Sequence, residues 1–379
     1  MSPGSALALA VAALAANSMV TFRAHTLAEN VRGAYQVLAF DVNNDGRPDL
    51  IALGNGSPDL LWFENPGWQR HVIAGGLNFI INADAYREPG SETPVLVLGH
   101  QFSMEPSRSV GAVSVLRPRG DPREPWSIEE IDRLPTTHRI RFADIDGTGR
   151  KVAVNAPLAN AGAASPDYKG RVPLVLYRPG IWKRELISDE LEGVLHGLAI
   201  ADWDGDGRDE ILTASFLGID VFKHTENGWR RSHVSEGNRN PWPKGGSSEL
   251  APGKLGGRRF LAALEPWHGN EVVVYREIPG GWRRQVIDDS FVTAHALVTA
   301  DINADGRDEI IAGYRDKGGR TYIYFADDAD GSSWRREDLD PQMPAAACVA
   351  ADLNGDGRAD LACAGGSSVK WYENLGPSK

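Results

Sequence analysis

Short apolar runs alternate along the chain with polar, glycine-rich segments, and the runs recur in phase with one another. Each run is rich in β-branched and aromatic residues, a composition typical of buried β-strands. Seven such runs occur: LLWFEN (60–65), VSVLRP (113–118), LVLYRP (174–179), IDVFKH (219–224), VVVYRE (272–277), YIYFAD (322–327) and VKWYEN (369–374).

A second repeated pattern is an aromatic residue followed by polar and then apolar positions, which is typical of a half-exposed strand. Six copies begin with tryptophan, and each follows one of the apolar runs. A seventh copy begins with Phe22 and stands alone near the N-terminus. The six tryptophan copies start at Trp68, Trp126, Trp182, Trp229, Trp282 and Trp334.

The two patterns together predict an all-β fold, a seven-bladed β-propeller of four-stranded blades over residues 20–375. The last apolar run has no tryptophan strand after it, and the strand at Phe22 has no apolar run before it. We therefore expect the N-terminal strand to complete the seventh blade. This closure of the ring leaves no open end of the blade ring for another chain to extend.

A third pattern lies between the first two predicted strands of four blades. It has oxygen-bearing side chains at alternate positions, then glycine, then a late carboxylate. Such a loop can wrap a hard Ca²⁺ ion, so four copies predict about four structural calcium sites. The alternative is a turn rich in Asp, Asn and Gly that needs no metal. The assigned positions are Asp41, Asn43, Asp45, Arg47, Asp49, Asp202, Asp204, Asp206, Arg208, Glu210, Asp301, Asn303, Asp305, Arg307, Glu309, Asp352, Asn354, Asp356, Arg358 and Asp360.

The remaining three blades depart from this calcium pattern. The loop of blade 3 starts at Asp144 but lacks the late carboxylate, because Val152 stands in its place. Blade 2 carries Tyr-Arg-Glu-Pro-Gly after Asp84, and blade 5 carries Pro-Gly-Lys-Leu-Gly-Gly at 252–257. We therefore expect no calcium in blades 2 and 5, and an incomplete ligand set in blade 3.

Composition limits the classes of partner. The formal net charge of −11 argues against nucleic acid, because phosphate binding needs clustered Lys and Arg. Residues 1–19 are rich in alanine and resemble the apolar part of a signal peptide, but they are too short to span a bilayer. We expect a leader at 1–19, a secreted or periplasmic protein without a transmembrane segment, and a monomer. The sequence leaves open whether Cys348 and Cys363 form a disulfide or stay reduced.

The segment Ala-Asp-Trp-Asp-Gly-Asp-Gly-Arg-Asp-Glu-Ile-Leu at 201–212 resembles the FG-GAP and VCBS repeats of integrin-type and secreted bacterial propellers. A finer resemblance comes from His196 and His295, each of which stands six residues before a first loop aspartate. This spacing is similar to that in the propeller domain of aldos-2-ulose dehydratases and in the related seven-bladed rhamnose–glucuronate lyases. Those enzymes eliminate across a sugar C–O bond, so the resemblance implies an elimination on a carbohydrate.

The histidine spacing also carries an expectation of its own. His138, His196 and His295 all stand six residues before the first loop aspartate, so each begins the innermost strand of its blade. Inner strands of a propeller begin at one mouth of the central channel, where we expect the three histidines to meet. The alternative is three buried histidines that are hydrogen-bonded to neighbouring blades. The equivalent positions in blades 1, 2 and 7 are Tyr35, Asn78 and Ala346.

Long loops between second and third strands are expected on the same face as these histidines, and such loops on a rigid ring often form sites. Aromatic residues there can stack on sugar rings, and arginine can bind a carboxylate through two hydrogen bonds. The candidate catalytic residues are His100, His138, His196, His295, Arg139, Tyr314 and Arg315. The candidate substrate-binding residues are Tyr168, Trp267, His268 and Lys317.

These candidates predict a secreted carbohydrate lyase or dehydratase whose substrate includes uronate-containing glycans. His100, His196 and His295 suit acid–base steps, and Arg139 or Arg315 would hold the anion. A further divalent metal at the channel mouth, held by two or three histidines, is a second role for them. The main alternative is a non-catalytic propeller that binds a glycan or a protein. A hydrolase with paired carboxylates is less favoured, because no acidic pair stands out on the predicted rim.

Overall fold

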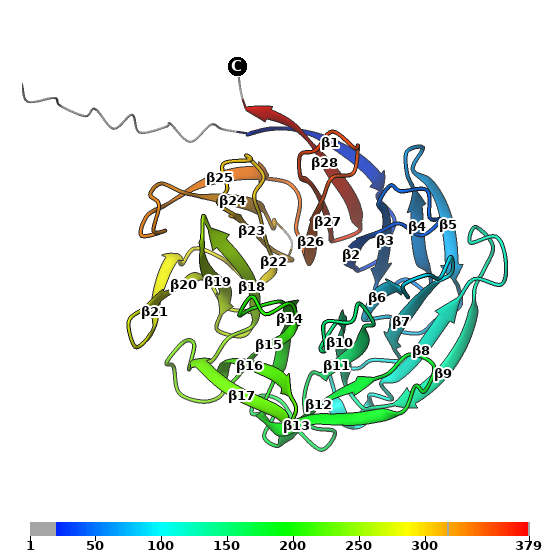
Figure 1. The fold of residues 1–379 in the computed structure, drawn as a ribbon, viewed down its shortest axis with the longest axis horizontal. Helices are drawn as coiled ribbons and strands as arrows, with labels where there is room; N and C mark the ends of the chain where they lie inside the picture. Colours follow the sequence, from blue (N-terminus) through cyan, green and yellow to red (C-terminus); the bar gives the residue numbers. More distant parts are fainter. Residues whose placement is uncertain (1–19, 317, 378–379) are drawn as a thin grey trace, which may run out of the picture.

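The computed structural model describes residues 20–316 and 318–377, which form seven four-stranded antiparallel sheets arranged in a ring (Figure 1). Each of the first six blades uses four consecutive strands, and its first strand lies nearest the centre of the ring. The predicted all-β, seven-bladed propeller is confirmed. The expected leader at 1–19 and the candidate Lys317 lie outside the described residues.

The first six blades have these strands. Blades 1 and 2 comprise β2 (Ala34–Phe40), β3 (Asp49–Gly54), β4 (Leu60–Glu64), β5 (Gln69–Ala74), β6 (Asn82–Arg87), β7 (Pro94–His100), β8 (Ala112–Arg117) and β9 (Ser127–Arg133). Blades 3 and 4 comprise β10 (Thr137–Ala143), β11 (Val152–Pro157), β12 (Arg171–Tyr177), β13 (Arg184–Glu192), β14 (Leu195–Ala201), β15 (Glu210–Ser215), β16 (Gly218–Thr225) and β17 (Gly228–Ser235). Blades 5 and 6 comprise β18 (Glu249–Leu255), β19 (Arg258–Glu265), β20 (Glu271–Ile278), β21 (Gly281–Asp288), β22 (Ala294–Ala300), β23 (Glu309–Tyr314), β24 (Thr321–Ala326) and β25 (Trp334–Asp340).

The seventh blade joins the two ends of the described chain. It comprises β26 (Ala347–Ala351), β27 (Asp360–Gly365), β28 (Ser368–Pro377) and β1 (Val20–Ala28). β1 pairs with β28 in antiparallel register, and Figure 1 shows the blue first strand beside the red last strand. The predicted closure by the N-terminal strand is confirmed, and β28 continues two residues beyond the expected end at residue 375.

Apolar packing between neighbouring blades fixes the ring. The second strands of the blades are almost fully buried, and β3, β15 and β27 contain only buried residues. Such strands read as continuous apolar runs, because both of their faces are covered by other blades. One cluster, for example, joins Val154 and Leu174 of blade 3 to Leu198 and Ile211 of blade 4. The starts of the inner strands are therefore held at fixed positions around the channel.

In blades 2 and 5 the structure differs from the repeat expected from the sequence. In blade 2, Asp84 lies within β6 rather than in a loop, and Asn78 precedes that strand instead of taking the histidine position. In blade 5, β18 continues to Leu255, so most of the segment 252–257 is strand and only Gly256 and Gly257 form the turn. The four calcium-type loops do lie between first and second strands, as expected.

Three further observations complete the fold. Cys348 on β26 lies opposite Cys363 on β27, and the two form a disulfide, which settles the question that the sequence left open. The helical structure found in the described residues includes a 3₁₀ turn at Pro106–Arg108. No helix within the described ranges is long and apolar enough to cross a membrane.

Candidate functional site

A β-bulge at the start of an inner strand positions each of four side chains. The strand register shifts by one residue at Tyr35 in β2, His138 in β10, His196 in β14 and His295 in β22. A bulge leaves one residue out of the ladder and re-aims its side chain, which is a common device next to functional sites. The shared spacing in the sequence thus corresponds to a shared backbone feature that turns four side chains towards the channel.

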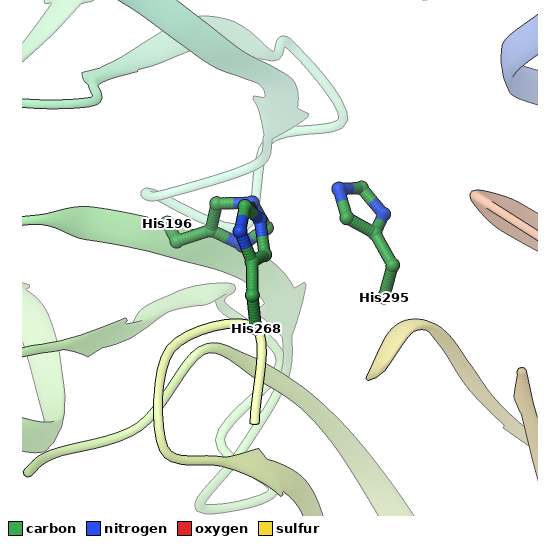
Figure 2. Close-up of side chains that lie close together, drawn as sticks. All are labelled: His196, His268 and His295. Carbon is green, nitrogen blue, oxygen red and sulfur yellow. Dashed lines mark hydrogen bonds between the residues drawn. The ribbon is translucent and has the colours of Figure 1, made fainter. Parts of the chain in front are cut away.

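The predicted meeting of the histidines is confirmed. The ring centroid of His196 lies 4.8 Å from that of His138 and 5.0 Å from that of His295. His268, from the loop after β19, joins them with its centroid 4.9 Å from His196 and 5.5 Å from His295. Figure 2 shows His196 and His268 in contact and His295 facing them from a separate segment. Three residues expected to be catalytic and one expected to bind substrate therefore form one cluster.

Hydrogen bonds assign the proton on two of these rings. Nδ1 of His295 lies 2.6 Å from the Ala346 carbonyl oxygen. Nδ1 of His196 lies 3.1 Å from the Ser248 carbonyl oxygen and 2.9 Å from Oε1 of Glu249. Because these oxygens only accept, each Nδ1 carries the proton and each Nε2 keeps a lone pair. Nε2 of His295 has no hydrogen-bond partner among the described residues, and Nε2 of His196 lies 3.3 Å from Nε2 of His268.

A second network joins Tyr35, His138, Arg139 and Glu249. The Tyr35 hydroxyl lies 3.0 Å from Nε2 of His138, and Arg139 donates to the hydroxyl oxygen at 3.2 Å. Arg139 also lies 3.4 Å from Nε2 of His138, which must accept because a guanidinium only donates. The other arginine nitrogen donates to Glu249 at 2.5 Å. The Tyr35 hydroxyl is thus held between a neutral imidazole and a buried cation.

Burial keeps these imidazoles neutral. Loss of solvation lowers the pKa of His138, His196 and His295 well below the usual histidine value, and the positive charge of Arg139 lowers all three further. Burial, followed by the neighbouring His196, lowers the pKa of His268 to about 2. Arg139 behaves in the opposite way, because Glu249 and Tyr35 outweigh its burial and raise the pKa of the guanidinium. Neutral imidazole is the form that accepts protons and binds metals.

A cavity of about 390 Å³ opens above this cluster. Its polar wall includes Tyr35, His138, His196, His268 and Arg315. Its apolar wall includes Phe102 and Trp267, and Trp267 is stacked on His268 with ring centroids 4.6 Å apart. A mainly apolar hollow with a few converging polar groups is the usual form of a small-molecule site. The arrangement can hold one sugar unit over the histidines.

Arg315 and Arg139 differ in their availability to a ligand. Arg315 lines the cavity, and within the described part of the chain it forms no ion pair. After burial, its positive charge is one of the causes that lower the pKa of His196, His268 and His295. Arg139 is buried and already bound to Glu249. Of the two arginines expected to hold a substrate anion, Arg315 is therefore the one that is available to do so.

Three other candidates lie outside the cavity. His100 is buried at the end of β7, where its Nε2 lies 2.9 Å from the Ser114 hydroxyl oxygen, and it does not join the histidine cluster. Tyr314 packs against Phe291 within blade 6. Tyr168 is buried behind Trp267, with the two rings edge to face at 5.5 Å, so it supports the cavity wall and does not line it.

Tyr35 and Glu249 are functional candidates that the sequence did not single out as such. Tyr35 stands in phase with the histidines, and this phase was the available signal. Glu249 begins β18 in blade 5, which lacks both the histidine and the loop aspartate that mark the phase in other blades. Its contacts with His196 and Arg139 arise only when blades 3, 4 and 5 meet at the channel.

The histidine cluster is a group of described residues that could hold a metal ion. One nitrogen from each of His196, His268 and His295 lies within 4.8 Å of the others. The free lone pair on Nε2 of His295 is aimed into this group, and the Nδ1 atoms of His196 and His295 are bound to acceptors that orient the rings. Metal-binding histidines usually have such outer partners.

The calcium-type loops of blades 1, 6 and 7 share one internal geometry. The first aspartate accepts backbone N–H groups from loop positions five and six, as Asp41 does from Asp45 and Gly46. The late carboxylate is buried and accepts the N–H of the second loop residue, as Glu309 does from Ile302. Burial raises the pKa of Glu309 to about 8 and that of Asp49 to about 6. Clustered carboxylate oxygens suit a hard cation, and calcium binding in these loops stays a prediction.

Comparisons with known proteins agree with this architecture. A model of the aldos-2-ulose dehydratase β-propeller domain matches residues 110–278, and an FG-GAP-like repeat model matches residues 301–363. The chain is 27% identical over 231 residues to an aldos-2-ulose dehydratase of Phanerodontia chrysosporium, a match that covers 53% of this chain. The match covers 25% of the length of that relative. The chain is therefore a seven-bladed β-propeller with FG-GAP-like repeats that is similar to the propeller domain of aldos-2-ulose dehydratase.

Proposed function

We propose that the protein is a carbohydrate-active carbon–oxygen lyase or dehydratase that eliminates across a sugar C–O bond in the cavity above the histidine cluster. The observation that carries the proposal is the Tyr35 hydroxyl, held between Nε2 of His138 and the Arg139 guanidinium at the floor of the cavity. Similarity to a dehydratase propeller supports the reaction class. The activity requires a proton to be moved off carbon and another to be given to the leaving oxygen.

Tyr35 and His138 form the proton-transfer pair in this proposal. The Tyr35 oxygen removes the proton beside the substrate carbonyl or carboxylate, while its own proton passes to Nε2 of His138. The C–H electrons form the C=C bond as the C–O bond breaks. The pair then returns one proton to the leaving oxygen, so no net proton is gained or lost. Arg139 stabilises the tyrosinate that forms during the transfer, because it already donates to that oxygen.

Two residues of the wall would bind the sugar. Arg315 holds a carboxylate or an enolate oxygen, since its guanidinium faces the cavity without an ion-pair partner in the described residues. Trp267 offers an aromatic face for the apolar side of a sugar ring, and its stacking on His268 fixes that face. A uronate-containing glycan presents both features, a carboxylate and a pyranose face.

His196, His268 and His295 would hold a divalent cation, with their pKa values lowered so that the lone pairs stay free. When bound, such a cation supplies Lewis-acid polarisation of a substrate oxygen. This role replaces the acid–base role expected for His196 and His295, because an Nε2 lone pair that binds a cation is not free to accept a proton from the substrate. We expect alanine at either position to abolish activity, and full activity in both variants would contradict the role.

The protein is proposed to act outside the cytoplasm, with calcium stiffening the blade hairpins. The disulfide between Cys348 and Cys363 supports an oxidising compartment. The oxygen-rich loops in blades 1, 6 and 7 support calcium, since each has three carboxylates and an asparagine at the alternate positions.

The decisive experiment is an ultraviolet assay of the purified protein with uronate-containing oligosaccharides. Elimination beside a carboxylate creates a conjugated C=C bond, so absorbance rises as product forms, and mass spectrometry shows cleavage without addition of water. The Arg315→Met variant is measured beside the native protein and should bind the substrate more weakly, because it lacks the guanidinium proposed to hold the carboxylate. Binding of sugars without any product would overturn the proposal and favour a non-catalytic glycan-binding propeller.

The Glu249→Gln variant tests whether Glu249 supports metal binding by the histidine cluster. Glu249 contacts Nδ1 of His196 and neutralises Arg139, so the amide removes a charge without changing shape. Loss of such an outer partner typically lowers metal affinity about 10–100-fold, and we expect a drop of this size. Calorimetric titration with Zn²⁺ or Mn²⁺ measures it in the intact chain. Glu271→Gln, on β20 and away from the channel, is the matched control, and equal affinities in the two variants would disprove the assignment.

A further inference from the structure

A lysine side chain lies inside the calcium-type loop of blade 4. Lys223 on β16 places its Nζ 2.7 Å from Oδ2 of Asp206 and 3.1 Å from Oε1 of Glu210, and it also contacts Asp204. Only 16% of the lysine side chain is exposed. Three carboxylates that the sequence assigned to calcium thus surround one ammonium group.

Strand register explains why the lysine reaches the loop. Ile211 of β15 pairs with Phe222 of β16, so Lys223 stands beside Glu210 at the end of the ladder. The corresponding positions in blades 1 and 7 are acidic, because Leu50 pairs with Phe63 and Leu361 pairs with Tyr372. The residues that follow there are Glu64 and Glu373. Among these three loops, blade 4 alone receives a cation from its third strand.

The loop of blade 4 is also the most acidic of the four. It has Asp204 at the third position, where the loops of blades 1, 6 and 7 have Asn43, Asn303 and Asn354. One positive charge offsets this additional carboxylate. The ammonium uses the oxygens that a calcium ion would need, and calcium requires 6–8 oxygen ligands at about 2.3–2.6 Å. A divalent ion among these oxygens would lie close to Nζ and be repelled by it.

We propose that the blade 4 loop is closed by the resident ammonium of Lys223 and binds no calcium. The loops of blades 1, 6 and 7 then remain as the three candidate calcium loops, instead of the four that the sequence predicts. In blades 6 and 7 the cation that contacts the fifth-position aspartate is the loop's own arginine, Arg307 or Arg358, and not a lysine from the third strand. The ammonium fulfils the structural role of the ion, since it ties Asp204 at the third loop position to the late carboxylate of Glu210.

Terbium luminescence tests this assignment, because Tb³⁺ replaces Ca²⁺ and emits when a nearby tryptophan is excited. Trp203 is the second residue of this loop, whereas the other three loops have Val42, Ile302 and Leu353 there. In the otherwise native chain, Trp203→Phe should leave Tb³⁺ emission unchanged within error. The Lys223→Gln variant should bind one more Ca²⁺ ion than the native chain in a calorimetric titration, and its Tb³⁺ emission should rise. Adding Trp203→Phe to Lys223→Gln should remove this rise in emission. Lys223→Arg keeps the positive charge and should gain neither.

Two results would overturn the proposal. One is a native chain whose Tb³⁺ emission falls on Trp203→Phe, because an ion would then already occupy the loop beside Lys223. The other is a folded Lys223→Gln protein, checked by circular dichroism, that binds the same number of Ca²⁺ ions as the native chain. The proposal is independent of the lyase assignment, since neither measurement involves a carbohydrate.

Discussion

Tyr35→Phe is expected to lower kcat for the proposed elimination by about 10²–10⁴-fold, the usual contribution of a positioned acid–base group. The substitution removes one hydroxyl and keeps the ring that packs between His138 and His295. It also leaves the contact of Arg139 with Nε2 of His138 in place. The loss should therefore fall on kcat, with KM changed by less than about threefold. Initial rates from the ultraviolet assay of unsaturated product measure both values.

Tyr314→Phe is the matched control, because it removes the same group from a tyrosine that packs in blade 6 outside the cavity. We expect this variant to keep the native rate. Thermal melts of both proteins separate an effect on chemistry from an effect on folding. Native kcat in a folded Tyr35→Phe protein would rule out the proposed proton transfer through this hydroxyl.

The ring was predictable from the sequence because its causes are local and repeated. Each blade carries the same order of buried, half-exposed and turn segments, and the unmatched strand at Phe22 indicated how the ends meet. The common spacing of His138, His196 and His295 could also be recognised in the sequence, since each lies in the equivalent bulge of its own blade. Repetition made both features visible without knowledge of any contact.

The parts that could not be predicted depend on contacts between segments that have no common phase. Glu249 lies in a blade without the loop that marks position, so its approach to His196 had no signal in the sequence. Lys223 reaches the blade 4 loop through strand register, which a spacing pattern within the loop does not contain. His100 seemed to belong to the rim, yet its ring turns to Ser114 on β8. The lowered histidine pKa values likewise follow from burial that only the closed ring creates.

Deletion of residues 20–28 is expected to destabilise the whole molecule, because β1 is the outer strand of blade 7. Seven residue pairs join β1 to β28, and each lost hydrogen bond typically costs about 0.5–1.5 kcal/mol. The deletion also removes the stacking of His25 on Trp371 at 4.3 Å and the contacts of Arg23 and His25 with Glu373. We expect the Tm to fall by on the order of 10 °C or more, measured by calorimetry.

A chain that begins at Val20 keeps β1 and is the matched control, with a Tm expected to equal that of the full chain. A synthetic peptide of residues 20–30 should restore much of the lost Tm to the deleted protein, because the exposed edge of β28 can accept an added strand. Restoration should depend on peptide concentration, as it does for any ligand that binds only the folded state. An unchanged Tm after deletion would show that six complete blades and a three-stranded seventh hold the ring without β1, and that closure contributes nothing measurable to stability.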